Sequence, residues 1–361
     1  MNLKDIAKTR LISQHINGSK FTTVKGLVGW MGAMQAQDYA MAKWAISTRA
    51  PGCTNSMVKA ALDKGEILRT HLMRPTWHFV EATDIYWMLE LTAPQIRALM
   101  RSRDKELELS EKLYKKGNHI IEKALIDEKH LTREEIMQRF EKAKIATDNY
   151  RSGHFMLRAE LDGIVCSGPM KGNKQTYALV SDRVSKPTAI SRDEALKKLA
   201  EKYFSSHCPA TIADFIWWSG LPVKDGKNAL EMIKKDFVSE TIGDETYWLP
   251  ASFTSIDISK SSAYLLPAFD EFLISYKDRI ASLQLQHQSK AFSVNGIFRP
   301  IIVINGQVAG LWKRTIKKDK LIIETDFFKT ASKAGKKQVE TAAKQYGRFL
   351  GMKASVVHGG A

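Results

Sequence analysis

The first eighty residues carry apolar side chains at helical spacing, and after residue 64 the pattern changes to one typical of strands. The two strands are joined at Arg74-Pro75, where a proline is tolerated. Helices are predicted over residues 3–16, 24–34, 38–48 and 55–64, the last capped by Asn55 or Ser56, and strands over 67–74 and 76–80. Helices followed by a short hairpin form the order of a winged helix-turn-helix unit.

The same order of elements occurs twice more along the chain. Thr132 and Glu135 have capping-box spacing, and Ser191 is placed to cap a later helix. Helices are predicted over residues 111–127, 136–143, 152–163, 191–205, 211–219 and 224–235, and strands over 164–167, 175–180, 237–242 and 245–249. No strict sequence period links the three units, so the repetition is one of architecture.

The last hundred residues have a different pattern, with short apolar strands and a tight-turn signal at Asn305-Gly306. Strands are predicted over residues 264–266, 301–304, 307–312 and 321–324, and an amphipathic helix over 336–350. The predicted class is mainly α with small β (α+β), with three tandem winged-helix units and a β-rich C-terminal region. The expected boundaries are 1–105, 106–186, 187–255 and 256–361.

Length, cysteine spacing and the lack of long apolar runs argue against a single small domain, a disulfide-rich protein and a membrane protein. A chain of 361 residues is longer than one core usually supports. Its cysteines, Cys53, Cys166 and Cys208, are far apart and favour neither a zinc site nor a disulfide framework. No apolar run is long enough to cross a membrane, and the N-terminus lacks the order of a signal peptide. We therefore expect a soluble, cytoplasmic and monomeric protein, with no metal and no cofactor.

Positive charge is concentrated at the two ends of the chain. The net charge is +16, and residues 1–80 hold 11 Lys/Arg against 4 Asp/Glu, while residues 311–361 hold 12 against 4. The middle of the chain is nearly balanced. If the ends meet in space they form one positive face, for which a phosphate backbone is the leading partner and a solvated lysine-rich surface the alternative.

Winged-helix units commonly contact duplex DNA with a helix and the hairpin wing. The basic residues near the first hairpin and after the strand at 307–312 are therefore the candidate DNA contacts. The lysine-rich cluster in the second group is also typical of a solvated turn. The candidates are Lys43, Arg49, Arg69, Arg74, His78, Lys313, Arg314, Lys317 and Lys318. The partner this predicts is double-stranded DNA, which would place the protein at the nucleoid.

Two glutamines separated by one small residue, Gln35-Ala36-Gln37, follow the second predicted helix. Alone, this spacing is a weak signal that is also typical of a solvated helix end. Asp38 is better placed as a helix cap than as a base. His71 and His78 lie across the predicted hairpin, but no third ligand is near enough in the pattern to indicate a metal site.

Several motifs together resemble the AlkZ-like winged-helix DNA glycosylases. They are Gln35-Ala36-Gln37, residues 74–78 (RPTWH), 207–215 (HCPATIADF), 217–222 (WWSGLP) and 265–271 (LLPAFDE), with Tyr276 and Arg279. They span most of the chain in the family's order. One departure is Pro75, where the family has Gly, which predicts a stiffer hairpin tip.

The resemblance implies a C-shaped fold around DNA and a monofunctional glycosylase that excises N7-alkylated or crosslinked guanine. It also implies that Gln35 and Gln37 hold the attacking water; a sister branch has Asp at the second position. Neutral amides suit this chemistry because N7 alkylation makes guanine cationic, so the base leaves without a general acid. What remains is to position water and stabilise the sugar cation.

Asp270 and Glu271 form a tempting carboxylate pair, which we interpret as structural and as an anchor for Arg279. Trp217 and Trp218 are interpreted as core residues rather than as a base-stacking platform. Two other functions stay open from the sequence alone. A non-enzymatic winged-helix regulator would prefer one DNA sequence, and a protein-interaction scaffold would bind no DNA.

Overall fold

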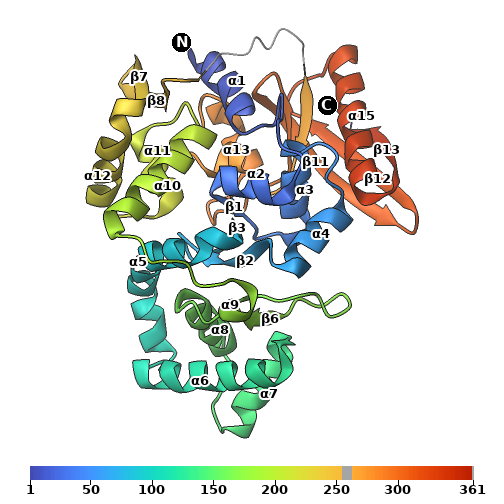
Figure 1. Ribbon diagram of the computed structural model, residues 1–361. Coiled ribbons are helices and arrows are strands. Elements are labelled where there is room, and N and C mark those ends of the chain that lie inside the picture. Colours follow the sequence, from blue (N-terminus) through green and yellow to red (C-terminus); the bar gives the residue numbers. More distant parts are fainter. Residues whose placement is uncertain (254–261, 360–361) are drawn as a thin grey trace.

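The computed structural model describes residues 1–253 and 262–359 (Figure 1). The predicted boundary between 255 and 256 lies outside the described residues. Helices and strands alternate in groups, which confirms the predicted α+β class. The number of winged-helix units stays a prediction, as do the boundaries between them.

The first region contains four helices and a three-stranded sheet. Its elements are α1 (Leu3–Ser13), α2 (Val24–Met31), β1 (Ala33–Gln35), α3 (Tyr39–Arg49), α4 (Asn55–Lys64), β2 (Ile67–Leu72) and β3 (Thr76–Glu81). The helix predicted to reach residue 34 ends at Met31, because Gly32 adopts a φ of 75° and the next residues pair with β3. The predicted cap of α4 was also wrong, since Thr54 accepts the hydrogen bond from Met57 N–H.

A long helix, α5 (Ile85–Glu106), follows the hairpin and leads to the lobe at the bottom of Figure 1. The sequence pattern predicted no element here. Pro94 lies inside the helix, and the second half is mostly polar. This lobe has its own apolar core, which includes Ile121, Phe140 and Phe155. Its elements are α6 (Glu111–Glu128), β4 (His130–Leu131), α7 (Arg133–Lys142), α8 (Arg151–Leu161), β5 (Val165–Ser167), β6 (Tyr177–Leu179) and α9 (Val180–Arg183).

The third group lies on the left of Figure 1 and packs through α10 against α5 and α2. Its elements are α10 (Arg192–Ser206), α11 (Ile212–Ser219), α12 (Val223–Ile233), β7 (Phe237–Ile242) and β8 (Glu245–Pro250). Capping boxes at Thr132 and Ser191 are present as predicted, and a further one starts α11 at Thr211. The capping residues therefore set the start of these helices locally.

The C-terminal region is built on a five-stranded sheet in the order β13-β12-β11-β10-β9. Its elements are β9 (Ala263–Leu266), α13 (Glu271–Ile274), α14 (Gln288–Ala291), β10 (Ile301–Ile304), β11 (Gln307–Lys317), β12 (Lys320–Phe327), α15 (Lys333–Leu350) and β13 (Lys353–His358). The last strand was not predicted; it pairs in parallel with β12 after the crossover through α15.

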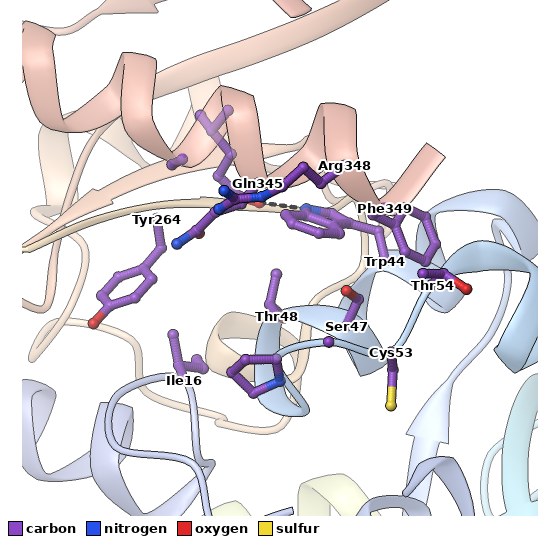
Figure 2. A pocket seen from close by; sticks show the side chains of 14 residues that line it. Ile16, Trp44, Ser47, Thr48, Cys53, Thr54, Tyr264, Gln345, Arg348 and Phe349 are labelled. Carbon is purple, nitrogen blue, oxygen red and sulfur yellow. Dashed lines mark hydrogen bonds between the residues drawn. The ribbon is translucent and has the colours of Figure 1, made fainter. Parts of the chain in front are cut away.

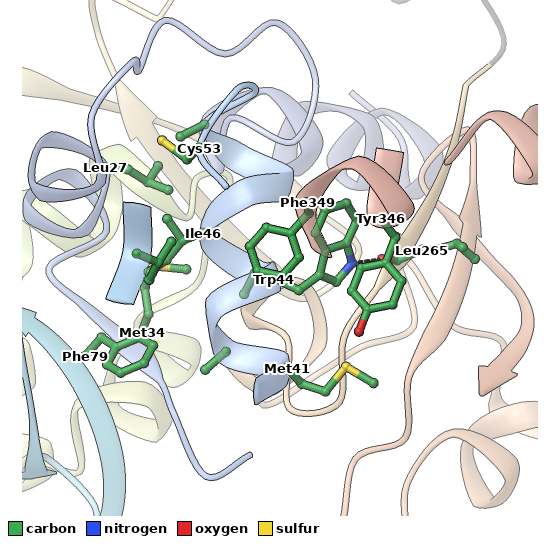
Figure 3. Packing of buried hydrophobic residues seen from close by; sticks show 14 of the residues in the cluster. Leu27, Met34, Met41, Trp44, Ile46, Cys53, Phe79, Leu265, Tyr346 and Phe349 are labelled. Atoms are coloured by element: carbon green, nitrogen blue, oxygen red, sulfur yellow. Dashed lines mark hydrogen bonds between the residues drawn. The ribbon is translucent and has the colours of Figure 1, made fainter. Parts of the chain in front are cut away.

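The first and last regions share one apolar core. Figure 3 shows α3 between Met34 and Phe79 on one side and the rings of Tyr346 and Phe349 on the other. The Trp44 indole lies 4.9 Å from the Tyr346 ring and donates its N–H to Leu265 O at 2.7 Å. Burial of aromatic rings at this joint holds the ends of the chain together, and the two basic segments come with them.

Candidate nucleic-acid and catalytic site

The Gln35-Ala36-Gln37 stretch begins at the last residue of an edge strand rather than at a helix end. β1 is the outer strand of the sheet β1-β3-β2, and Gln35 is opposite His78. Beyond the strand, Ala36 N–H donates to Trp77 O at 2.7 Å, which keeps the backbone extended. Gln37 follows two residues after the end of the strand, in a bend.

The two glutamines differ in exposure. Gln35 is 5% exposed, and its Oε1 is buried and accepts no hydrogen bond within the described part of the chain. Gln37 is exposed, and its Oε1 accepts a long hydrogen bond of 3.4 Å from the backbone N–H of Trp77. A buried amide oxygen without a donor is costly unless a ligand or water satisfies it. The Gln35 amide oxygen is therefore a buried acceptor without a donor among the described residues.

Asp38 caps helix α3, as the sequence indicated. Its Oδ1 accepts from Ala40 N–H at 3.1 Å and from Met41 N–H at 3.0 Å. Both bonds stabilise the start of the helix. The carboxylate next to the glutamines is thus engaged in structure.

Arg69 buttresses the motif from inside the fold. Its guanidinium donates to Ala36 O through Nε at 3.1 Å and Nη2 at 3.0 Å, and to Gln175 Oε1. It also lies 4.0 Å from the centre of the Trp77 ring. Burial lowers the pKa of Arg69 to about 10, which still leaves it charged at neutral pH. The structure places Arg69 behind the glutamine pair, with its guanidinium bound to Ala36 O and Gln175 Oε1.

Arg49 is fully buried, which is inconsistent with the predicted DNA contact. Nη1 and Nη2 donate to the two oxygens of Asp270 at 2.9 and 2.7 Å, and Nη2 also donates to Gln14. A guanidinium enclosed in this way has no path to a phosphate. Arg49 instead ties α3 to the start of α13.

His78 is also buried and hydrogen-bonds within the hairpin. Its Nδ1 lies 2.9 Å from Thr76 O, and burial together with the nearby Arg74 lowers its pKa to about 4. His71, which lies across the hairpin from this region, pairs with the buried Glu160 of α8 and not with His78. Residues 1–253 and 262–359 contain no cluster of three His, Cys, Asp or Glu side chains suited to a metal ion.

Arg74 lies at the tip of the hairpin against helix α11. Its guanidinium is 5.4 Å from the Trp217 ring, and its Nε is buried with no acceptor among the described residues. The close approach depends on Gly220, where an added Cβ would lie 2.9 Å from Met73 O. Trp218 is buried as predicted, whereas Trp217 is 39% exposed and so is not a core residue.

A second group of cations lies where α3 meets β11. Lys43 is 7% exposed, and burial, with Lys59 and Arg314 nearby, lowers its pKa to about 8. The Arg314 guanidinium lies 5.6 Å from the Tyr346 ring. Within the described residues neither cation has an ion-pair partner, which is the condition expected of side chains that bind an anion.

The end of the β11–β12 hairpin is open to solvent. Lys313 is exposed and pairs with Glu324 at 2.8 Å, while Lys317 and Lys318 are exposed at the turn. Surface ion pairs of this kind contribute little to stability. The predicted basic cluster therefore lies on the surface, adjacent in the sheet to Arg314.

Glu271 is the contact that the sequence analysis missed. Its Oε1 accepts the backbone N–H of Gln35, although the two residues are far apart in sequence. The predicted anchor for Arg279 was wrong, because the guanidinium of Arg279 donates to the carbonyls of Leu273 and Lys277. The adjacent carboxylates at 270 and 271 could be noticed in the sequence. Only the tertiary fold shows that Glu271, and not Asp270, accepts a hydrogen bond from the glutamine motif.

A cavity of about 380 Å³ lies between α3 and α15, away from the glutamines (Figure 2). Its lining includes Trp44, Thr48, Tyr264 and Arg348, and none of the predicted site residues. No helix among the described residues is both long and apolar enough to cross a bilayer. Lys43, Arg314 and the Gln35 amide oxygen are therefore not part of this cavity.

Comparison with known proteins identifies the family of this chain. The interstrand DNA cross-link repair glycosylase of Streptomyces sahachiroi is 23% identical over 332 residues, covering 84% of this chain and 85% of that protein. The solved structure of Streptomyces sahachiroi DNA glycosylase AlkZ matches with a TM-score of 0.81 at 20% identity, covering 99% of this chain and 100% of that one. A family profile described as DNA glycosylase AlkZ-like matches residues 28–349. The chain therefore belongs to the AlkZ-like DNA glycosylase family.

Proposed function

We propose that the protein hydrolyses the N-glycosidic bond of N7-alkylguanine in duplex DNA, with interstrand crosslinks through the same position as further substrates. The observation that carries the proposal is the buried Gln35 Oε1, which accepts no hydrogen bond in the described chain and lies at the end of strand β1, two residues before Gln37. The Streptomyces relative is an interstrand DNA cross-link repair glycosylase, which supports the same substrate class.

The chemistry requires little from acids or bases. Water adds its oxygen to C1′ of the sugar as the bond from C1′ to N9 breaks, and the bonding electrons leave with N9. Those electrons neutralise the cationic guanine ring, so the base departs uncharged and the water proton passes to solvent. Amide oxygens at Gln35 and Gln37 orient the water and direct their dipoles toward the developing sugar cation. An undamaged base would leave as an anion and is not a substrate.

The DNA would lie across the first and last regions of the chain. Lys43, Arg74 and Arg314 are cations without an ion-pair partner among the described residues, and Lys317 and Lys318 extend the positive surface along the β11–β12 hairpin. A phosphate backbone satisfies such groups by direct contact and release of counterions. We propose a monomer that acts on DNA alone, with no metal or cofactor.

Incubation of the purified protein with a duplex carrying one N7-methylguanine, followed by alkali cleavage, tests the activity. We expect strand breaks at the lesion and none at normal guanine. Gln35→Ala and Gln37→Ala should each slow excision by about 10²- to 10³-fold with duplex affinity unchanged. Absence of breaks with both this lesion and a crosslinked duplex would refute the proposal.

A further inference from the structure

Glu271 contacts the backbone of the glutamine motif. Since β1 is an edge strand and the next N–H, that of Ala36, bonds Trp77, the Gln35 N–H points away from β3. Glu271 Oε1 accepts that N–H at 2.5 Å. The carboxylate thus takes the place of a missing neighbour strand and fixes the peptide that carries Gln35.

The second oxygen of Glu271 is also enclosed. Oε2 accepts Ser275 Oγ–H and lies 3.7 Å from His207 Nε2, and the residue is 2% exposed. Burial raises the pKa of Glu271, but the facing His207 and the donors Gln35 N–H and Ser275 Oγ–H outweigh it and hold the pKa at about 2. A buried carboxylate with these donors is charged at neutral pH.

The neighbouring hairpin lies within the field of this charge. Burial lowers the pKa of Arg74 and of His78, and the nearby charge of Glu271 opposes that lowering in both. His78 is the residue opposite Gln35 across the sheet. The carboxylate therefore lies one hydrogen bond from the backbone of Gln35.

We propose that Glu271 is a positioning residue for the hydrolysis, which holds the Gln35 backbone and sets a fixed negative charge behind the water. This rests on the proposed function. As the bond to N9 breaks, positive charge moves from the guanine ring to the sugar. A preorganised anion on the water side favours that movement, and the neutral amides of Gln35 and Gln37 provide only dipoles.

The residue before it provides a matched control. Asp270 is equally buried, but its two oxygens are bound by the Arg49 guanidinium. Its side chain accepts one other hydrogen bond within the described residues, from Phe272 N–H and not from the glutamine motif. Its charge is therefore neutralised at short range. If any buried carboxylate at this place supported excision, Asp270→Asn and Glu271→Gln would lower the excision rate equally.

The test is single-turnover excision of N7-methylguanine by Glu271→Gln, which keeps the size and an acceptor for Gln35 N–H but removes the charge. We expect a rate about 10- to 100-fold below wild type, with duplex Kd within about twofold and a cooperative thermal transition. Asp270→Asn should lower the melting temperature but excise within about threefold of wild type in its folded fraction. Glu271→Asp, which keeps the charge, should excise faster than Glu271→Gln.

A folded Glu271→Gln protein that excises within threefold of wild type would overturn the role of the charge, as would Glu271→Asp excising no faster. The positioning role has a test that needs no activity. Hydrogen–deuterium exchange of the peptide containing Gln35 should be faster in Glu271→Ala than in wild type and Asp270→Asn, and equal exchange would overturn it. If wild type does not excise the lesion, the proposed function fails, while the exchange measurement still decides whether Glu271 holds Gln35.

Discussion

The two basic ends of the chain have almost the same charge and use it in opposite ways. In the first region Arg10, Arg49 and Arg69 are buried, and each donates hydrogen bonds to groups inside the fold. In the β11–β12 hairpin, Lys317 and Lys318 are exposed at the turn. Charge counted along a sequence thus overestimates the cations that a DNA backbone can reach, because guanidinium groups also serve as internal connectors.

The strongest test of this contrast is Arg49→Ala. It leaves Asp270 charged, buried and unpaired, which should lower the free energy of unfolding by about 3–5 kcal/mol. Urea denaturation followed by circular dichroism measures the change. A variant with wild-type stability and weakened DNA binding would show that Arg49 belongs to the DNA surface after all.

His78 predicts a dependence of stability on pH. Its pKa is about 4 in the folded protein and about 6.5 when unfolded, so the unfolded state binds more protons between these values. Stability from this group is complete above pH 6.5 and falls by about 3 kcal/mol as pH drops to 4. Denaturation curves at several pH values should show this loss in wild type and a smaller one in His78→Gln. Equal slopes in both proteins would contradict it.

Arg69→Lys separates a buttress from a DNA contact. A lysine cannot donate through two nitrogens to Ala36 O while it also reaches Gln175, so we expect a loss of about 1–2 kcal/mol in stability. Excision should slow because the Ala36 carbonyl, between the two glutamines, is held by fewer hydrogen bonds. Duplex affinity measured by fluorescence anisotropy should not change, and a large loss of affinity with intact stability would place Arg69 on the DNA surface.

The smallest effect is expected from the exposed lysines. Lys317→Ala with Lys318→Ala should weaken duplex binding by about fivefold and reduce the slope of log Kd against log salt by about 2. Stability should stay within about 0.5 kcal/mol of wild type. A salt titration with an unchanged slope would mean that the β11–β12 hairpin does not contact phosphate. The exposed lysines of the C-terminal end would then not serve DNA binding.

Sequence patterning predicted most elements to within a few residues. The helix over residues 55–64 and the strands at 237–242 and 301–304 are confirmed, because capping residues, turns and apolar periodicity act locally. The strand that carries Gln35 was missed. Three residues are too short for a period to show, and β1 exists only because β3 pairs with it.

What the sequence by itself determined is the class of fold, the family and the glutamine motif, since these depend on local propensity and on motifs in a fixed order. The tertiary structure decided which charges are available. It buried Arg49 against Asp270, turned Arg69 inward to Ala36, and brought Glu271 to the Gln35 N–H. Contacts between residues so far apart in sequence arise from packing that brings distant segments together, so no local pattern records them.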